Sequence, residues 1–455
     1  MSGFLSWFKS NIILVILGIL TVVPLPVAWY FSTGMNAKLR ESRQEEAQKA
    51  LRDVQNAKVT YSLPALSNTE EPVSDNGPPN AAKTAFYKAE LEKRLSAIEQ
   101  IKQRAVSFNE KDHHVLLEGL FPMPESPAAG QILRPEMASI VLAHGPEDEP
   151  SAYDKLFKRL RIRPPLDPVQ LAEQLAARKS ALMDQLAPGT AESALDEATR
   201  AQIEQQLVEE RLARYETHAR DTSIYGDDSI LPAVVPRVVP SIDPSIETCF
   251  EWQMDYWLIE DLLSAMVEAN NMFDATGVGG NVLVGPVKRI ESIEFAPMFV
   301  GVQSAAAESQ NIFEGSADAQ ARELARSRNA ERGGFAGAGG GPVPSGTFTG
   351  RESEKSELYD VRVATVTMIV SYEKLPALIN AISGYNFMTV LDADLYAVDQ
   401  WEQIEQGYYA GGDFPVRVEM QIETLWLRNW TKQYMPPSIR TQLGIPDDLP
   451  TDGPA

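Results

Sequence analysis

The sequence has little cysteine, histidine and positive charge. One cysteine among 455 residues excludes an intramolecular disulfide framework and any zinc site built on cysteines. Four histidines leave little material for a histidine-rich metal centre. Lys and Arg number 41 against 63 Asp and Glu, and the net charge of -22 argues against a nucleic-acid partner, because phosphate backbones require clustered basic residues. The hydrophobic content of 44% predicts a core of ordinary size, divided over two or three folding units.

Recognisable catalytic and cofactor motifs are also missing. The glycines of 276–286 lack a Gly-Lys-Ser/Thr and follow a predicted helix, so a turn is favoured over a phosphate-binding loop. His113 and His114 are adjacent and would point about 100° apart on a helix, which favours a solvated helix face over a metal site. Asp392 and Asp394 share a strand face without the glycine of a calcium loop. We therefore predict no enzyme activity, cofactor, metal or small-molecule substrate.

A long uncharged run stands near the N-terminus. After a tail at 1–10, residues 11–32 contain enough apolar sequence to cross a bilayer as a helix. Pro24 and Pro26 are tolerated in membrane helices. The run is longer than the core of a usual signal peptide and no good cleavage site follows, so a retained anchor is favoured. Basic residues after the run place the body in the cytoplasm, but long domains can be translocated regardless of charge, so orientation stays open.

Residues 33–118 are predicted to form a helical stalk. Segments 36–58 and 81–110 are charged and rich in alanine, and residues 67–80 between them have the composition of a loop. The two helices could fold back as a hairpin or, as we favour, form a stalk interrupted by a flexible joint. The second helix carries an apolar seam with spacings typical of a short coiled coil. The seam residues are candidate protein contacts: Tyr87, Leu91, Leu95 and Ile98.

Residues 119–245 are predicted to be an insertion between stalk and core domain. The segment is rich in proline and poorly periodic at first. Asp167 and Pro168 then form a helix start, as N-cap and first helical residue, and a second helix runs to about Arg220. We expect these helices to form an antiparallel pair, followed by a proline-punctuated extended linker at 230–244.

Residues 246–434 are predicted to form an α+β domain. Its expected elements are helix 250–271, strand 287–295, strand 359–372, a helix between Ser371 as N-cap and Gly384 beyond its end, and strands 387–398 and 415–426. Two helices and four strands in this order predict a split ferredoxin-like sandwich. Residues 303–356, which divide it, have low complexity and are predicted to be a disordered loop, and 435–455 an extended, partly disordered tail.

Exposed aromatic residues suggest a second contact region. Tyr408 and Tyr409 lie in a glycine-flanked segment that should bury poorly, and Trp401 precedes it. Because aromatic side chains are favoured interface anchors, these three are predicted protein contacts. As an alternative, the 400–414 loop could bind a ligand or an envelope polymer.

The order of these elements resembles that of the bitopic inner-membrane proteins of type IV pilus and type II secretion machines, of the PilO kind, including pilus-like proteins of the Verrucomicrobia–Planctomycetes group. The resemblance is carried by the anchor, the Leu-x-x-Ala-x-x-Glu-Ala run at 262–269, the strand at 287–295, the Ala-Ile-Ser-Gly of 381–384 and the last two strands. The insertion at 119–245 departs from the usual layout of that family.

The resemblance implies a non-enzymatic scaffold in the bacterial inner membrane. It implies that the N-terminus lies in the cytoplasm and that most of the chain is periplasmic. The stalk and the ferredoxin-like domain would associate with a second copy or with homologous bitopic envelope proteins. The alternative function is a membrane-anchored ligand-binding or sensory module.

Overall fold

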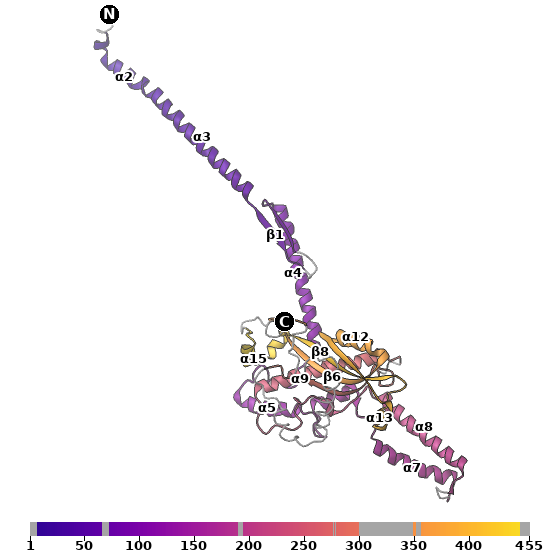
Figure 1. The fold of residues 1–455 in the computed structure, drawn as a ribbon. Helices are drawn as coiled ribbons and strands as arrows, with labels where there is room; N and C mark the ends of the chain where they lie inside the picture. Colours follow the sequence, from indigo (N-terminus) through magenta and orange to yellow (C-terminus); the bar gives the residue numbers. More distant parts are fainter. Residues whose placement is uncertain are drawn as a thin grey trace, which may run out of the picture. The chain divides into compact units, whose positions relative to one another are not determined.

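The structure is a computed structural model that describes residues 7–65, 72–189, 194–275, 277, 279–299, 349–351 and 356–445 (Figure 1). The chain divides into two compact units, Met1–Arg104 and Ala105–Ala455. Each unit is described by itself.

The first unit begins with a helix that is long and apolar enough to cross a membrane. It spans Ile12–Val54 and comprises α2 (Ile12–Val22) and the first part of α3 (Pro24–Asn56). Pro24 occupies the first turn of α3, where its missing N–H costs least. The apolar side chains of this helix are exposed in the single chain.

A two-stranded ribbon follows this helix, and its second strand lies in the segment 67–80 that was predicted to be a loop. β1 (Val59–Leu63) pairs antiparallel with β2 (Val73–Gly77). The ribbon packs on α4 (Ala81–Glu110): the Tyr61 ring stacks on Tyr87 at 5.0 Å, and the Tyr61 hydroxyl lies 2.9 Å from Thr84 Oγ1. The prediction missed β2 because its Ser-Asp-Asn-Gly sequence has low strand propensity; its pairing with β1 and its contact with α4 stabilise it instead.

The second unit is built on a six-stranded mixed sheet. The spatial order is β3-β4-β5-β6-β8-β7; β3 and β4 pair in parallel, as do β4 and β5, and the other pairs are antiparallel. The strands are β3 (Ile162–Arg163), β4 (Ile224–Tyr225), β5 (Val287–Phe295), β6 (Tyr359–Ser371), β7 (Met388–Ala397) and β8 (Pro415–Leu427).

Two helices, α9 (Ile246–Asn271) and α12 (Leu375–Tyr385), pack together over the sheet. Their buried side chains share one core with the inward residues of β6 and β8. β8 alternates in its first half, as its sequence predicts: Val418, Met420 and Ile422 are buried, whereas Arg417 and Glu419 are exposed. The alternation fails at Glu423, which was expected on the polar face and is buried. A short 3-10 turn, η4 (Tyr372–Lys374), separates β6 from α12.

This turn changes the predicted ends of α12. Lys374 is the N-cap residue in place of Ser371, and Gly384 lies inside the last turn, before the helix ends at Tyr385. The 3-10 turn moves the start of the helix by three residues. The polar residue at position 371 suits an N-cap and therefore gave no sign of this turn.

The segment 119–245 is not separate from the core domain. α6 (Ala152–Leu160) buries Leu156 and Phe157 in the main core, and Ile224 of β4 joins the same cluster. α5 (Pro127–Ile140) packs its Met137 against Trp252 of α9. Because β3 and β4 have two residues each, they carry no readable periodicity.

The helical pair of this segment packs on the domain through the last turns of α8, where Tyr215 stacks on Tyr409 and Ala219 is buried. α7 (Pro168–Leu186) and α8 (Glu197–Asp221) lie side by side (Figure 1), and Arg178 Nε on α7 is 3.0 Å from Glu210 Oε2 on α8. Asp167 accepts a hydrogen bond from the Val169 amide, which confirms it as the N-cap.

The chain does not become an extended tail at residue 435. Met435, and Ile439 on α15 (Pro437–Gln442), are buried in the main core. Met435 is extended and precedes the helix, and only Ile439 lies on it, so six helical residues in a proline-rich segment gave no readable pattern. Residues 446–455 lie outside the described residues, as does most of the predicted disordered loop at 303–356.

Candidate functional site

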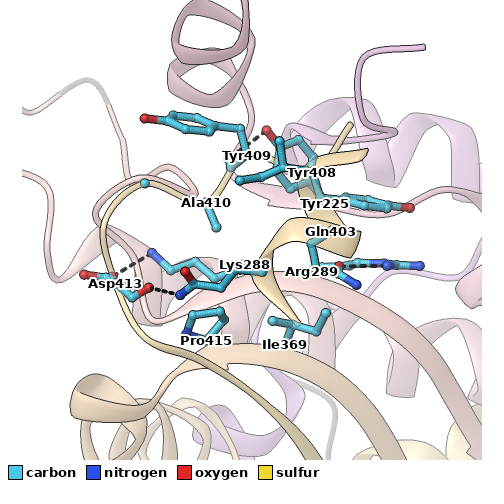
Figure 2. A pocket seen from close by; sticks show the side chains of 13 residues that line it. Tyr225, Lys288, Arg289, Ile369, Gln403, Tyr408, Tyr409, Ala410, Asp413 and Pro415 are labelled. Carbon is cyan, nitrogen blue, oxygen red and sulfur yellow. Dashed lines mark hydrogen bonds and ion pairs between the residues drawn. The ribbon is translucent and has the colours of Figure 1, made fainter. Parts of the chain in front are cut away.

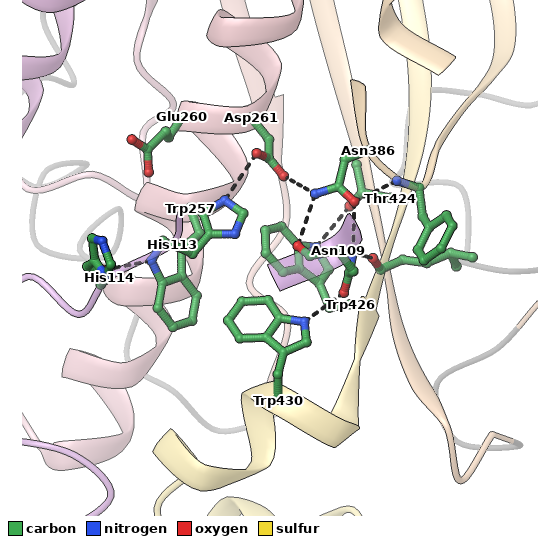
Figure 3. Close-up of polar contacts among 12 residues, drawn as sticks. Asn109, His113, His114, Trp257, Glu260, Asp261, Asn386, Thr424, Trp426 and Trp430 are labelled. Carbon is green, nitrogen blue, oxygen red and sulfur yellow. Dashed lines mark hydrogen bonds and ion pairs between the residues drawn. The ribbon is translucent and has the colours of Figure 1, made fainter. Parts of the chain in front are cut away.

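A buried polar junction surrounds the end of α4, within the second unit (Figure 3). Asn109, only 1% exposed, makes four side-chain hydrogen bonds. Its amide nitrogen donates to the Leu425 carbonyl and to Asn386 Oδ1, both at 2.9 Å. Its Oδ1 accepts from the Leu427 amide and from Trp430 Nε1, both at 2.8 Å. One asparagine therefore joins α4 to the end of β8 and to the loop before β7.

His113 extends this junction towards α9. Its Nε2 lies 3.1 Å from Asp261 Oδ1, and Asp261 Oδ2 accepts a hydrogen bond of 2.7 Å from Asn386. The imidazole stacks on Trp430, with ring centroids 5.6 Å apart. Burial lowers the pKa of His113, but the hydrogen bond and the negative charge of Asp261 outweigh it and raise the pKa above its ordinary value.

The sequence did not reveal this junction. His113 was expected on a solvated helix face but is buried, because the chain turns inward directly after α4. The partners of Asn109 are 277 to 321 residues distant, so no local spacing connects them. A polar residue at the end of an amphipathic helix is an ordinary surface pattern, and burial alone makes Asn109 unusual.

A second buried polar group lies between α9 and β6. The Arg362 guanidinium contacts Glu251 at 3.0 Å and also Asp255. Two carboxylates therefore share one cation. Burial raises the pKa of Asp255 to about 7 although Arg362 opposes the shift, and it raises the pKa of Glu251 as well. This cluster can hold a proton near neutral pH, but it faces core residues rather than a cavity.

The 400–414 loop is anchored rather than free. After α13 (Gln400–Glu405), the Tyr408 ring packs against Tyr225 at 5.5 Å and beneath the Arg289 guanidinium at 3.9 Å. The Tyr409 carbonyl accepts a hydrogen bond of 3.1 Å from the Tyr225 hydroxyl. Both predicted contact residues are half-buried within their own chain. Trp401, by contrast, is 76% exposed.

A small cavity lies beneath this loop (Figure 2). Lys288 reaches its floor, and the Lys288 ammonium is 2.8 Å from Asp413 and 2.7 Å from the Val282 carbonyl. Lys374 binds the same Asp413 oxygen at 2.7 Å. The cavity of about 40 Å³ has room for a few water molecules, far less than the space a bound metabolite needs. The lysines therefore fix the loop by neutralising Asp413.

The seam predicted on α4 is covered in part. Tyr87 lies under the ribbon, and Leu91 is half-buried. Leu95 is 52% and Ile98 37% exposed, and Ile101, one turn further, is 58% exposed. The first unit thus leaves the second half of the seam open.

Within the residues that the structure describes, no group of three or more His, Cys, Asp and Glu could hold a metal ion. The single cysteine, Cys249, is buried on α9, and burial raises its pKa to about 12. Its thiol is therefore protonated at neutral pH and is a poor nucleophile.

The comparisons with known proteins return little. No family model and no curated protein match the chain. One solved structure, the type 4 fimbrial biogenesis protein PilO from Pseudomonas aeruginosa, aligns over 26% of this chain and 95% of its own length. The aligned residues are 12% identical and the TM-score is 0.13.

Proposed function

We propose that this protein is a non-enzymatic, single-pass membrane scaffold of a pilus- or secretion-like envelope assembly. The apolar helix at Ile12–Val54 supports the anchor, since it carries exposed aliphatic side chains that a bilayer would cover. The stalk and the α+β domain would act by association, with a second copy or with homologous bitopic proteins.

The observation that carries the proposal is the open half of the α4 seam. Leu95, Ile98 and Ile101 are exposed on a helix rich in charged residues, and the ribbon that covers Tyr87 does not cover them. An apolar stripe on a charged helix is stabilised when a second helix covers it. This stripe follows the membrane helix in the chain, so association of stalks would align neighbouring anchors in one bilayer.

We infer that the domain is a ferredoxin-like sandwich widened by β3 and β4. The order β5-β6-β8-β7, with antiparallel pairing and two helices packed together over the sheet, supports this inference. We place the protein in the bacterial inner membrane with the domain on the periplasmic side, in keeping with the order of elements in the sequence.

Cysteine crosslinking in native membranes tests the stalk. In a Cys249→Ala background, which removes the one native cysteine, Leu95→Cys and Ile98→Cys are oxidised in the full-length protein. Lys93→Cys is the control, because residue 93 is exposed and lies about 200° from residue 95 around the helix.

We expect crosslinked products from residues 95 and 98 and little from residue 93. A product of doubled mass would identify self-association, and a different mass would identify a second protein for mass spectrometry. Equal yields at all three positions, or none at any, would overturn stalk association.

A further inference from the structure

Exposed apolar side chains gather at the end of the sheet where β6 ends and β8 begins. We call this surface the sheet-end patch. Trp401 is 76%, Phe414 70% and Tyr372 59% exposed. Phe273, at the end of α9, and Val284, before β5, complete it. The sequence predicted a contact at Trp401 but gave no sign of the other four, since they come from separate elements.

Hydrogen bonds bring these elements together. The Tyr372 amide donates to the Phe414 carbonyl at 3.0 Å, which extends the β6–β8 ladder by one residue pair and places the two aromatic residues opposite each other. The Lys374 ammonium donates to the Val284 carbonyl at 2.9 Å and lies 5.5 Å from the Phe273 ring centroid. Tyr372, Phe414, Val284 and Phe273 therefore stand on segments that are joined directly to one another at this end of the sheet.

The base of the patch is held firmly. Asp413, next to Phe414, binds Lys374 at 2.7 Å and the buried Lys288 at 2.8 Å. Gln400, next to Trp401, donates to the Asp413 carbonyl at 3.2 Å. Because these contacts fix the backbone of both aromatic residues, little ordering entropy remains to be lost when a partner binds.

We propose that the sheet-end patch is a docking surface for a basic segment of another protein that carries an apolar anchor. Exposed Trp, Tyr and Phe on a fixed base have the composition of interface hot spots. A few such side chains gathered on one surface indicate an interaction site more strongly than scattered ones do.

The charge of the surroundings indicates the chemistry of the partner. The nearby cations are all engaged: Lys288 and Lys374 bind Asp413, Arg289 packs over the Tyr408 ring, and Arg417 pairs with Glu291. Glu373 and Glu402, by contrast, are exposed on the flanking turns. An acidic rim around apolar anchors attracts Lys and Arg. A second copy, with a net charge of -22, is the less suitable occupant. The surface would serve the proposed scaffold role, yet it does not require association of the stalks.

Photo-crosslinking of the full-length chain in native membranes tests the patch. Benzoylphenylalanine replaces Phe414, and Val208 on α8 receives the same probe as an equally exposed control. The crosslinked peptide is identified by mass spectrometry. The yield is then measured again with Trp401→Ala, with Glu373→Lys plus Glu402→Lys, and with salt raised from about 0.05 to about 0.3 M.

We expect residue 414 to capture a segment with Lys or Arg beside an apolar residue. Trp401→Ala should lower the yield about tenfold, and charge reversal or salt several-fold. No product, a product with a second copy only, or one insensitive to charge and salt would overturn the proposal. Crosslinks through the stalk would persist in that case, so the two proposals fail separately.

Discussion

Asn109 and Asn386 form a reciprocal amide pair, although 277 residues separate them in the chain. The Asn109 side chain donates to Asn386 Oδ1 at 2.9 Å, and the Asn386 side chain donates to the Asn109 backbone carbonyl at 3.2 Å. The pair fixes the last turns of α4 inside the second unit.

Asn109→Ala should destabilise the second unit by about 3 kcal/mol, because it leaves the buried Leu427 amide and Trp430 indole without an acceptor. Denaturant unfolding of the full chain in detergent, followed by tryptophan fluorescence, measures the change; Trp257, Trp426 and Trp430 are buried in this unit. Gln103→Ala, at an exposed position of the same helix, is the control. Equal unfolding midpoints for the two variants would contradict the role assigned to Asn109.

Gly407→Ala should destabilise the loop that carries Tyr408. Gly407 has φ +92°, and a Cβ there would lie inside van der Waals contact with the Leu166 carbonyl oxygen. A side chain at this position forces a backbone shift at an expected cost of about 2 kcal/mol or more. Gly412→Ala is a matched control, since nothing lies within 4 Å of its Cβ position.

Thermal unfolding and limited proteolysis between residues 400 and 414 are the measurements. We expect a lower midpoint and faster cleavage for Gly407→Ala only. If both glycine variants behave like the native protein, the loop is not held as the Tyr225 and Arg289 contacts indicate.

Long periodic elements could be predicted from the sequence, and short ones could not. β8 alternates from Val416 to Ile422, and the α7–α8 pair begins at a recognisable N-cap, so local pattern sufficed there. β3 and β4 have two residues each, and β2 is almost wholly polar. Pairing with neighbours that are distant in sequence decides these strands, and a single sequence carries no such information.

The candidate contact residues also fall into two groups: those whose exposure the local sequence indicated, and those that distant elements cover. Tyr408 and Tyr409 stand in a glycine-flanked segment that is typical of an exposed loop, yet Tyr225 and Arg289 cover them from separate elements. Composition indicated exposure correctly at Trp401, where no such partner covers the ring. The Asn109 junction had no signal, because its parts are ordinary residues made unusual by burial.

His113 should make stability fall as pH rises above about 6.5. Its pKa is raised in the folded state, so the folded chain holds a proton that the unfolded chain releases. The His113–Asp261 contribution is full below about pH 6.5, the unfolded pKa, and is lost as pH rises through the folded pKa. His113→Gln should flatten this part of the profile, measured as thermal midpoints between about pH 6 and 9. If the thermal midpoint of His113→Gln depends on pH as steeply as that of the native protein, a protonated His113 does not stabilise the fold.

Asp255 should give a separate slope at lower pH. Burial raises its pKa from 3.8 to about 7, so between these values the folded carboxyl keeps a proton that the unfolded one has lost. Stability therefore falls as pH rises through this window. Asp255→Asn keeps the shape of the side chain and leaves Arg362 paired with Glu251 alone. The free energy of unfolding of the variant, relative to that of the native protein, should therefore rise by about 1 kcal/mol or more between pH 5 and pH 8. Asp148→Asn, which removes an exposed carboxyl, is the control. Parallel curves for Asp255→Asn and the native chain would show that Asp255 stays ionised beside Arg362, because only a carboxyl that binds a proton within this range can produce the difference.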